Sequence, residues 1–210
     1  MASEDKIGDK LAPYNPTHLD CVSKALTLLE VDSGDVFYDL GCGDGRLVVY
    51  AVKNYGCRGI GVEYDGKLVE RGRDGIASMG AYRELASIVH DDVQNVAFGD
   101  ATKIFVYLVP AGMKALAPRL TEFLRRGGRC VTYVFSIPGL APVSTDLYKG
   151  STKIYLYTAA SVPGYTPPAG SDATSGAGAG VGASGAVTRR FLTVVAVPLL
   201  FALLSRLLAP

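Results

Sequence analysis

The chain has 210 residues, which is enough for one domain of ordinary size with additional terminal segments. Its net charge is +1 with 20% charged residues, so no basic field indicates a nucleic-acid partner, and none is expected. Four cysteines without a C-x-x-C pair, and only two histidines, exclude a zinc-type spacing and predict no metal site.

The first ten residues are polar and mixed in charge, and we expect them to form a tail before a domain spanning residues 11–160. They show neither a secretory signal nor a cleavable mitochondrial presequence. A proline-braced segment then precedes a helix predicted over residues 19–29, with Thr17 as its candidate N-cap. Tyr14 and Pro16 either fold over a ligand pocket as a lid or provide a rigid lead-in to the helix.

The central pattern is a buried strand over residues 36–40, a glycine-spaced turn, a helix that ends at Gly56, and a second buried strand that ends in Glu63. This order of strand, glycine-rich turn, helix and acid-tipped strand is typical of the first half of a nucleotide-binding βαβ unit.

The glycine spacing narrows the choice of ligand. The position three residues after Gly43 is Arg46, which does not fit the dinucleotide pattern G-x-G-x-x-G, and no Gly-Lys-Ser/Thr follows as in a P-loop. The run from Asp39 through Gly41 and Gly43 to Gly45 resembles motif I of the class I S-adenosylmethionine (SAM) methyltransferases. SAM carries no phosphate but has an amino-acid end and a sulfonium cation, so an acidic side chain at the strand end suits SAM better than an anion-binding turn would. The alternative is a purely structural glycine turn in another kind of α/β protein. In either case we expect Cys42 to be a small filler in the turn.

Further acids follow the next strand. A helix is predicted from Tyr64-Asp65 to about residue 79, and a strand over residues 86–90 precedes Asp91 and Asp92. Acids at the carboxyl ends of parallel strands face the ligand crevice, so one of these two can accept a hydrogen bond from an adenine amino group. Asp92 is the preferred candidate and Asp91 the alternative, with helix N-capping as the rival role for either.

The rest of the domain continues the alternation of strands and helices. We expect an apolar strand over residues 103–109, a helix over about 113–125, a strand over 128–135, a proline-rich loop over 136–145, and a last strand over 153–158 belonging to an antiparallel pair. This order predicts an α/β sheet with one core.

The composition changes after residue 160. Residues 161–188 are rich in Gly, Ala, Pro and Ser and are predicted to be a flexible linker. Residues 189–210 begin with two arginines and continue as a mostly apolar run, which we interpret as a C-terminal membrane anchor that leaves the domain facing the cytosol. The alternative is a helix that packs on the domain or on a partner.

Several local patterns together are similar to one family. They are Pro13-Tyr14-x-Pro16, the turn from Tyr38 to Arg46, the strand from Arg58 to Glu63, Tyr107-Leu-Val-Pro110, and the strand from Arg129 to Phe135. Over about residues 11–158 they resemble the small methyltransferases that include the lysine methyltransferases of the ATP synthase c-subunit and of the adenine nucleotide translocase. Two features depart from that family: the apolar segment follows the domain, and Val93-Gln94 stands where Leu-Trp is usual.

The resemblance implies a Rossmann-like class I methyltransferase fold, with a seven-stranded, mostly parallel sheet and helices on both faces. It implies SAM as the methyl donor, with Asp39, Gly41 and Gly43 at its methionine end, Glu63 at the ribose and Asp92 at the adenine. The whole predicted cofactor site is Asp39, Leu40, Gly41, Cys42, Gly43, Gly45, Glu63, Tyr64, Asp92 and Val93. The residues expected to line the acceptor pocket, and therefore the catalytic candidates, are Tyr14, Tyr107 and Pro110.

The function predicted from these patterns is methylation of a protein lysine, on a membrane-associated or mitochondrial protein. The alternatives are methylation of a small molecule or a lipid, and a non-catalytic scaffold tethered to a membrane. Methylation of a nucleobase amino group is disfavoured because the segment after the fourth strand is Val109-Pro110-Ala111, without the Asn/Asp-Pro-Pro-aromatic turn used for that chemistry. A mitochondrial membrane is one expected location.

Overall fold

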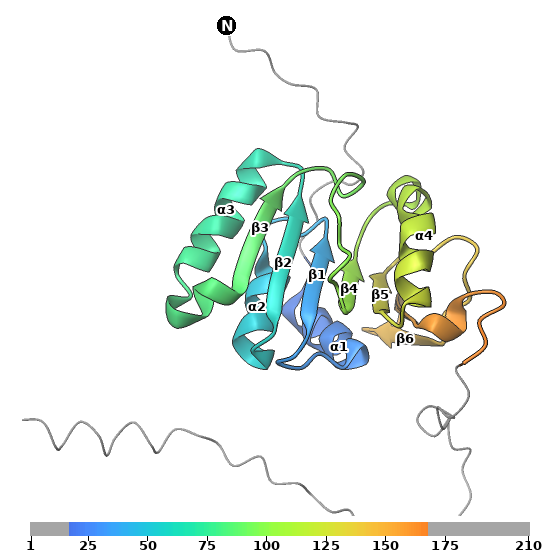
Figure 1. Cartoon of the computed structure of the whole chain (residues 1–210). Coiled ribbons are helices and arrows are strands. Elements are labelled where there is room, and N and C mark those ends of the chain that lie inside the picture. The colour runs from blue at the N-terminus through green and yellow to red at the C-terminus, as the bar shows by residue number, and fades with distance from the viewer. Residues whose placement is uncertain (1–16, 168–210) are drawn as a thin grey trace, which may run out of the picture. The chain divides into compact units, whose positions relative to one another are not determined.

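The computed structural model describes residues 17–167, which are built around a seven-stranded sheet in the order β3-β2-β1-β4-β5-β7-β6 (Figure 1). The first five strands in this order are parallel, and β7 runs antiparallel to both β5 and β6. The mostly parallel seven-stranded sheet expected from the sequence is therefore confirmed. The strand bounds are β1 Val36–Leu40, β2 Arg58–Glu63, β3 Ala86–His90, β4 Lys103–Val106, β5 Arg129–Tyr133, β6 Ser144–Tyr148 and β7 Thr152–Tyr157.

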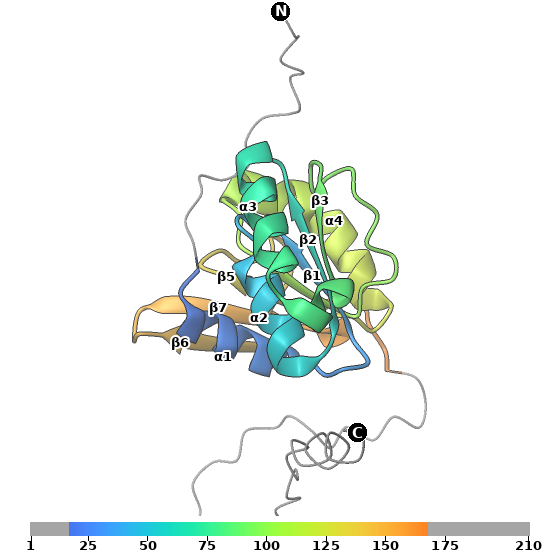
Figure 2. The ribbon, with the colours of Figure 1, turned by 90° about the vertical axis from the view of Figure 1, so that its left-hand side faces the viewer.

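Helices cover both faces of the sheet, as predicted. Figures 1 and 2 show α1, α2 and α3 on one face and α4 on the other. Their bounds are α1 Leu19–Leu29, α2 Arg46–Tyr55, α3 Gly66–Ala77 and α4 Pro110–Arg125, with short 3-10 helices η1 Gly80–Leu85 and η2 Ala159–Ser161.

The core has two apolar clusters, one on each side of the sheet. The cluster beneath α1, α2 and α3 includes Leu26, Val48 and Phe105, and the cluster beneath α4 includes Leu40 and Leu116, all of them buried. Neighbouring residues of the central strands alternate between the two clusters. These strands are covered on both faces, which explains why they read as continuous apolar runs in the sequence.

Some element ends differ from the prediction. The strand expected to reach residue 109 ends at Val106, and α4 begins at Pro110 rather than near residue 113. Proline suits the first helical position because its fixed φ fits a helix and its missing N–H has no intrahelical partner there. The N-cap of α1 is His18 rather than Thr17, without a capping side-chain hydrogen bond.

The end of the domain also contains structure that the sequence did not indicate. β6 begins at Ser144, inside the expected loop, and forms the antiparallel partner of β7. Ser161 and Val162 are buried, and Val162 belongs to the cluster beneath α4, so packed residues extend two positions past the expected domain end at 160. The predicted linker beyond residue 167 and the predicted anchor over residues 189–210 lie outside the described residues.

The chain order places a topological switch point between β1 and β4. From β1 the chain proceeds to β2 and β3 in one direction, and it then returns to β4 and β5 on the other side of β1. In open α/β sheets, ligands bind at the carboxyl ends of the strands where the order reverses. Within residues 17–167, no helix has the length and apolar character needed to cross a membrane.

Candidate cofactor site at the carboxyl ends of the strands

The turn after β1 depends on glycines. Gly41, Gly43 and Gly45 have φ values of 86°, 58° and 71°, which side chains rarely tolerate. The backbone N–H groups of Gly41 and Cys42 donate to the carbonyl oxygen of Val62 at 2.9 and 3.0 Å, which joins the turn to β2. A Cβ atom on Gly41 would lie 2.8 Å from Leu108 Cδ2, so the turn after β1 lies directly against the turn after β4.

Three other residues of the predicted site are packed in the interior or allow close packing of neighbouring elements. A Cβ atom on Gly45 would lie 2.9 Å from Ile88 Cδ1 and 3.4 Å from the α-carbon of Gly72, so Gly45 permits the close approach of α2 and α3. Cys42 is buried and fills the space over Gly61, and burial raises the pKa of its thiol well above the usual range. The side chain of Leu40 is fully buried, which leaves its backbone at the strand end.

Glu63 links the end of β2 to the glycine turn. Its Oε2 accepts a hydrogen bond from Gly43 N–H at 2.8 Å, and its Oε1 accepts from the N–H groups of Tyr64 and Asp65 at 3.0 and 2.9 Å. An ionised carboxylate has about four lone-pair positions. Glu63 therefore fixes the turn and keeps capacity for one more donor, such as a ribose hydroxyl.

Asp39, at the carboxyl end of β1, is 3% exposed. Burial raises its pKa well above the usual range, and the negative charges of Glu63 and Asp44 raise it further. Asp44 forms a two-point pair with Arg46, with Nε–Oδ1 and Nη2–Oδ2 distances of 2.9 and 2.7 Å. A cationic ligand next to Asp39 would offset this accumulation of negative charge, and the methionine end of SAM, with its ammonium and sulfonium groups, fits such a site.

Asp92, the candidate for the adenine, organises the turn after β3. Its Oδ1 accepts from Gln94 N–H at 2.8 Å, and its own N–H donates to Asp91 Oδ1 at 2.7 Å. These bonds stabilise a turn, and no helix directly follows Asp92, so the rival role of helix N-capping is not seen here. Asp92 is 8% exposed and Val93 5% exposed, and contact of either with adenine stays a prediction.

Sequence reasoning missed Arg119 on α4. Its Nη1 donates to the carbonyl oxygens of Val93 and Gln94 at 2.8 and 2.7 Å, and its Nη2 donates to Val96 O. The guanidinium also lies 4.4 Å from the centre of the Phe98 ring. Arg119 on α4 thus holds the loop after β3 in place. Its position three residues after the buried Leu116 was the available signal, since that spacing places a cation beside the apolar face.

Two of the three catalytic candidates, Tyr107 and Pro110, lie within the described residues. Tyr107 is partly buried and is the first residue after β4 rather than a strand residue, and its ring centre lies 4.9 Å from that of Tyr133 in an edge-to-face arrangement. Pro110 is exposed at the start of α4. Tyr14 lies outside the described residues. Tyr133 was not among the candidates, because its place beside Tyr107 depends on the pairing of β4 with β5.

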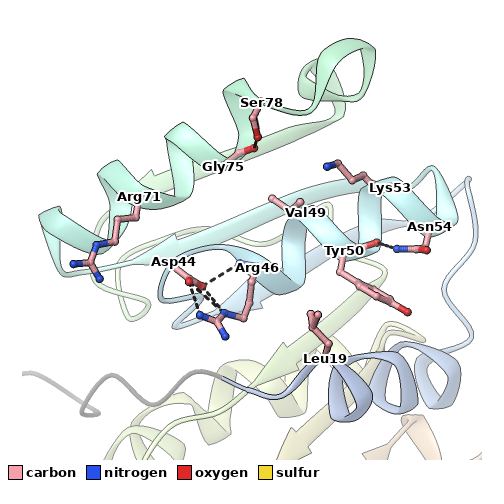
Figure 3. Close-up of a pocket in the computed structure, with 10 residues that line it drawn as sticks. All are labelled: Leu19, Asp44, Arg46, Val49, Tyr50, Lys53, Asn54, Arg71, Gly75 and Ser78. Carbon is pink, nitrogen blue, oxygen red and sulfur yellow. Dashed lines mark hydrogen bonds and ion pairs between the residues drawn. The ribbon is translucent and has the colours of Figure 1, made fainter.

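A separate groove lies on the outer surface of α2 and α3, next to Leu19 of α1 (Figure 3). Arg46, Lys53 and Arg71 give it a basic lining, and the Asp44–Arg46 pair stands at one end. Most of its lining belongs to these helices rather than to the strand ends, so we assign the cofactor to the strand-end site. Across residues 17–167 no three His, Cys, Asp or Glu side chains are grouped as a metal site.

Comparisons with known proteins agree on a methyltransferase. Residues 39–144 match the family model described as the ANTKMT methyltransferase domain. A protein-lysine N-methyltransferase of Saccharolobus islandicus is 33% identical over 149 residues, covering 69% of this chain and 92% of that protein. The lysine N-methyltransferase of the ATP synthase C subunit from Xenopus laevis is 28% identical over 130 residues, covering 62% of this chain and 56% of that protein.

A solved structure shows the same fold with a product of the cofactor. It is an RNA methyltransferase from Salinibacter ruber in complex with S-adenosyl-L-homocysteine, with a TM-score of 0.66 and 34% identity, covering 73% of this chain and 97% of that one. The Rossmann-like class I methyltransferase fold and the use of SAM, both expected from the sequence, are confirmed.

The raised pKa of Asp39 predicts how its removal changes stability. The folded protein holds the Asp39 proton more tightly than the unfolded chain, so Asp39 lowers stability as pH rises from about 4, the unfolded pKa, through the folded pKa. We expect Asp39→Asn to raise the free energy of unfolding relative to the unaltered chain, by more at pH 8 than at pH 5, in urea titrations without ligand. Asp74→Asn, at an exposed position on α3, is the matched control. Equal loss of stability in Asp39→Asn at both pH values would contradict this.

Proposed function

The chain belongs to the ANTKMT methyltransferase family and is a SAM-dependent methyltransferase, and we propose that its acceptor is a lysine side chain of a protein. The observation that carries the proposal is the Saccharolobus islandicus relative, a protein-lysine N-methyltransferase that this chain matches over 92% of its length. The Xenopus laevis relative, a lysine N-methyltransferase of the ATP synthase C subunit, supports the same acceptor group.

In such a reaction, we assign cofactor binding and acceptor approach to opposite sides of the switch point. When bound, SAM supplies a methyl group whose bond to sulfur breaks as the acceptor nitrogen forms its new bond to carbon, leaving S-adenosylhomocysteine and a proton. We assign Asp39 and the glycine turn to the methionine end and Glu63 to a ribose hydroxyl, which the burial of Asp39 and the Glu63–Gly43 hydrogen bond support. The turn after β4, which touches Gly41 through Leu108, then borders the side from which an acceptor must approach.

The acceptor nitrogen must lose its proton before it can attack. A free lysine has a pKa of about 10.4, and partial removal of water around it favours the neutral amine. Tyr107 and Tyr133 offer partly buried aromatic surface next to the turn after β4, which supports an acceptor pocket there. Because methyl transfer relies on alignment of the two reactants, this division of roles requires no dedicated base.

RNA is the second candidate acceptor. The Salinibacter ruber structure, described as an RNA methyltransferase, is 34% identical to this chain and is covered over 97% of its length. Against it, α4 begins directly at Pro110 after Val109, and this turn offers no Asn or Asp side chain to hold a nucleobase amino group. We therefore favour lysine and treat RNA as an outcome of the experiment below.

The sequence also supports a location at a membrane. Residues 189–210 are mostly apolar and begin with two arginines, and we propose that they attach the enzyme to a bilayer with its domain in the cytosol, a mitochondrial membrane being one candidate. The proposal rests on composition alone, since this segment lies outside the described residues.

The acceptor is tested by labelling. The full chain is incubated with methyl-labelled SAM and a membrane fraction, and the label is traced after separation of protein, lipid and RNA. We expect label on lysine in a protein band, and none with Gly41→Ala, because a Cβ atom there would meet Leu108 in the turn beside the cofactor. Label in RNA would favour the second candidate, and label in lipid would contradict both.

The membrane attachment predicts a change in sedimentation. The full chain is expected to pellet with membranes and to resist extraction by high salt, whereas the chain without residues 189–210 is expected to remain in the supernatant. The shortened chain should still bind SAM, because every described site residue is kept. Pelleting of the shortened chain to the same extent would refute the proposed anchor.

A further inference from the structure

Three tyrosine rings lie together on the sheet face covered by α1: Tyr107 follows β4, Tyr133 ends β5 and Tyr148 ends β6. The ring centres of Tyr107 and Tyr133 are 4.9 Å apart with an interplanar angle of 73°, and those of Tyr133 and Tyr148 are 6.4 Å apart at 71°. All three side chains are partly buried and pack against the core cluster beneath α1. We call these three residues the tyrosine surface.

The tyrosine surface stands on the side of the switch point that the cofactor leaves open. Asp39 lies near the end of β1, the glycine turn follows β1, Glu63 ends β2 and Asp92 follows β3. The predicted cofactor contacts therefore all lie at β1, β2 and β3, on one side of the switch point. An acceptor must therefore approach from β4 and β5. Val106 pairs with Thr132, which places the next residues, Tyr107 and Tyr133, side by side at this approach.

A strained turn holds Tyr133 in place. Val134 has a φ of 69°, an outlier for a β-branched residue, and Phe135 N–H donates to Tyr133 O at 2.8 Å, which closes a γ-turn. Thr132 Oγ1 donates to Phe135 O at 2.7 Å, and Val134 N–H donates to Lys153 O at 2.9 Å. Such strain persists only where the surrounding structure imposes it, and it is concentrated at functional sites.

The Tyr133 hydroxyl has close side-chain neighbours. The side chains of Cys21 and Thr152 lie next to this hydroxyl and influence its pKa. Burial, followed by the neighbouring Cys21, raises the pKa of Tyr133 to about 12, so the phenol stays neutral at physiological pH. What Tyr133 presents to a ligand is consequently the face and edge of its ring rather than a basic oxygen.

The same surface already accommodates an ammonium group. Lys149 Nζ lies 5.3 Å from the centre of the Tyr148 ring, within the range of a cation–π contact. We propose that Tyr133, supported by Tyr107, forms the aromatic wall that receives the acceptor lysine in its ammonium form, before the nitrogen loses its proton and attacks, and thereby determines specificity for a cationic side chain. This inference rests on the proposed lysine function and deepens it.

The test measures binding rather than turnover. The full chain, saturated with S-adenosylhomocysteine, is titrated calorimetrically with N-acetyl-trimethyllysine amide and with its uncharged isostere, in which carbon replaces the nitrogen. The unaltered chain should bind the cation more tightly. Tyr133→Leu should weaken binding of the cation by about two- to thirtyfold, the range of a cation–π contact, without weakening binding of S-adenosylhomocysteine.

Tyr133→Phe separates the ring from its hydroxyl. It keeps the aromatic face but removes the hydroxyl next to Cys21 and Thr152, so we expect cation affinity within about twofold of the unaltered chain. A purely structural role of the hydroxyl would instead make Tyr133→Phe as defective as Tyr133→Leu.

A second pair of variants guards against misfolding. Val134→Gly keeps all three rings but loosens the turn that holds Tyr133, and it should weaken binding of the cationic probe. Glu30→Gly is the matched control, since Glu30 also has a positive φ, of 55°, but stands at the far end of α1, and it should leave probe affinity unchanged.

The outcomes separate this inference from the proposed function. Lysine labelling together with equal affinity for cation and isostere, or with unchanged cation affinity in both Tyr133→Leu and Val134→Gly, would overturn the inference and leave the proposed function standing. Label in RNA together with binding of the cation that depends on Tyr133 would overturn the proposed function and keep the aromatic wall as an ammonium site.

Discussion

The carboxylate of Glu63 joins the end of β2 to the glycine turn after β1, and the geometry of the site depends on this contact. It accepts hydrogen bonds from three backbone N–H groups, of Gly43, Tyr64 and Asp65. The charged acceptor makes these bonds stronger than bonds between neutral groups. Without it, the turn would keep the bonds of Gly41 and Cys42 to Val62 but would lose its link to the side chain predicted to contact the ribose.

Glu63 is also one of several acids in this site. Burial, and then the negative charges of the nearby Glu63 and Asp44, raise the pKa of Asp39. A site for a phosphate-containing dinucleotide would suffer from this arrangement, whereas a ligand with ammonium and sulfonium groups relieves it. Across the switch point, we propose that aromatic rings rather than acids meet the incoming acceptor. In this proposal acids bind the permanently cationic donor, and tyrosines border the acceptor side.

The parts of this account that the sequence could predict are local ones. Asp39, Gly41, Gly43 and Glu63 are set by a turn and a strand end within 25 residues, so their pattern is readable without a structure. The alternation of strands and helices predicted an α/β sheet, but it did not predict β6, since Ser144 to Tyr148 is a short edge strand that follows a proline-rich loop.

The contacts that the sequence did not reveal depend on long-range pairing. Arg119 reaches the loop after β3 from a helix more than twenty residues later. The sequence predicted that the strand containing Tyr133 continues to residue 135, and the β-branched Val134 favours extended backbone. In the structure this strand ends at Tyr133. The positive φ of Val134 is imposed by its hydrogen bond to Lys153 and by the hydrogen bond that closes the γ-turn. No local sequence pattern indicates either bond.

The central claim is that the glycine turn and the acids beside it hold SAM. Calorimetric titration of SAM into the unaltered chain, Gly41→Ala and Gly80→Ala tests this most directly. Both glycines have positive φ, but a Cβ atom on Gly41 would meet Leu108 whereas one on Gly80 would meet nothing within 4 Å. The account predicts equal SAM affinity for the unaltered chain and Gly80→Ala, and affinity at least about tenfold lower for Gly41→Ala. An unaltered chain that does not bind SAM, or Gly41→Ala that binds it equally well, would contradict the account.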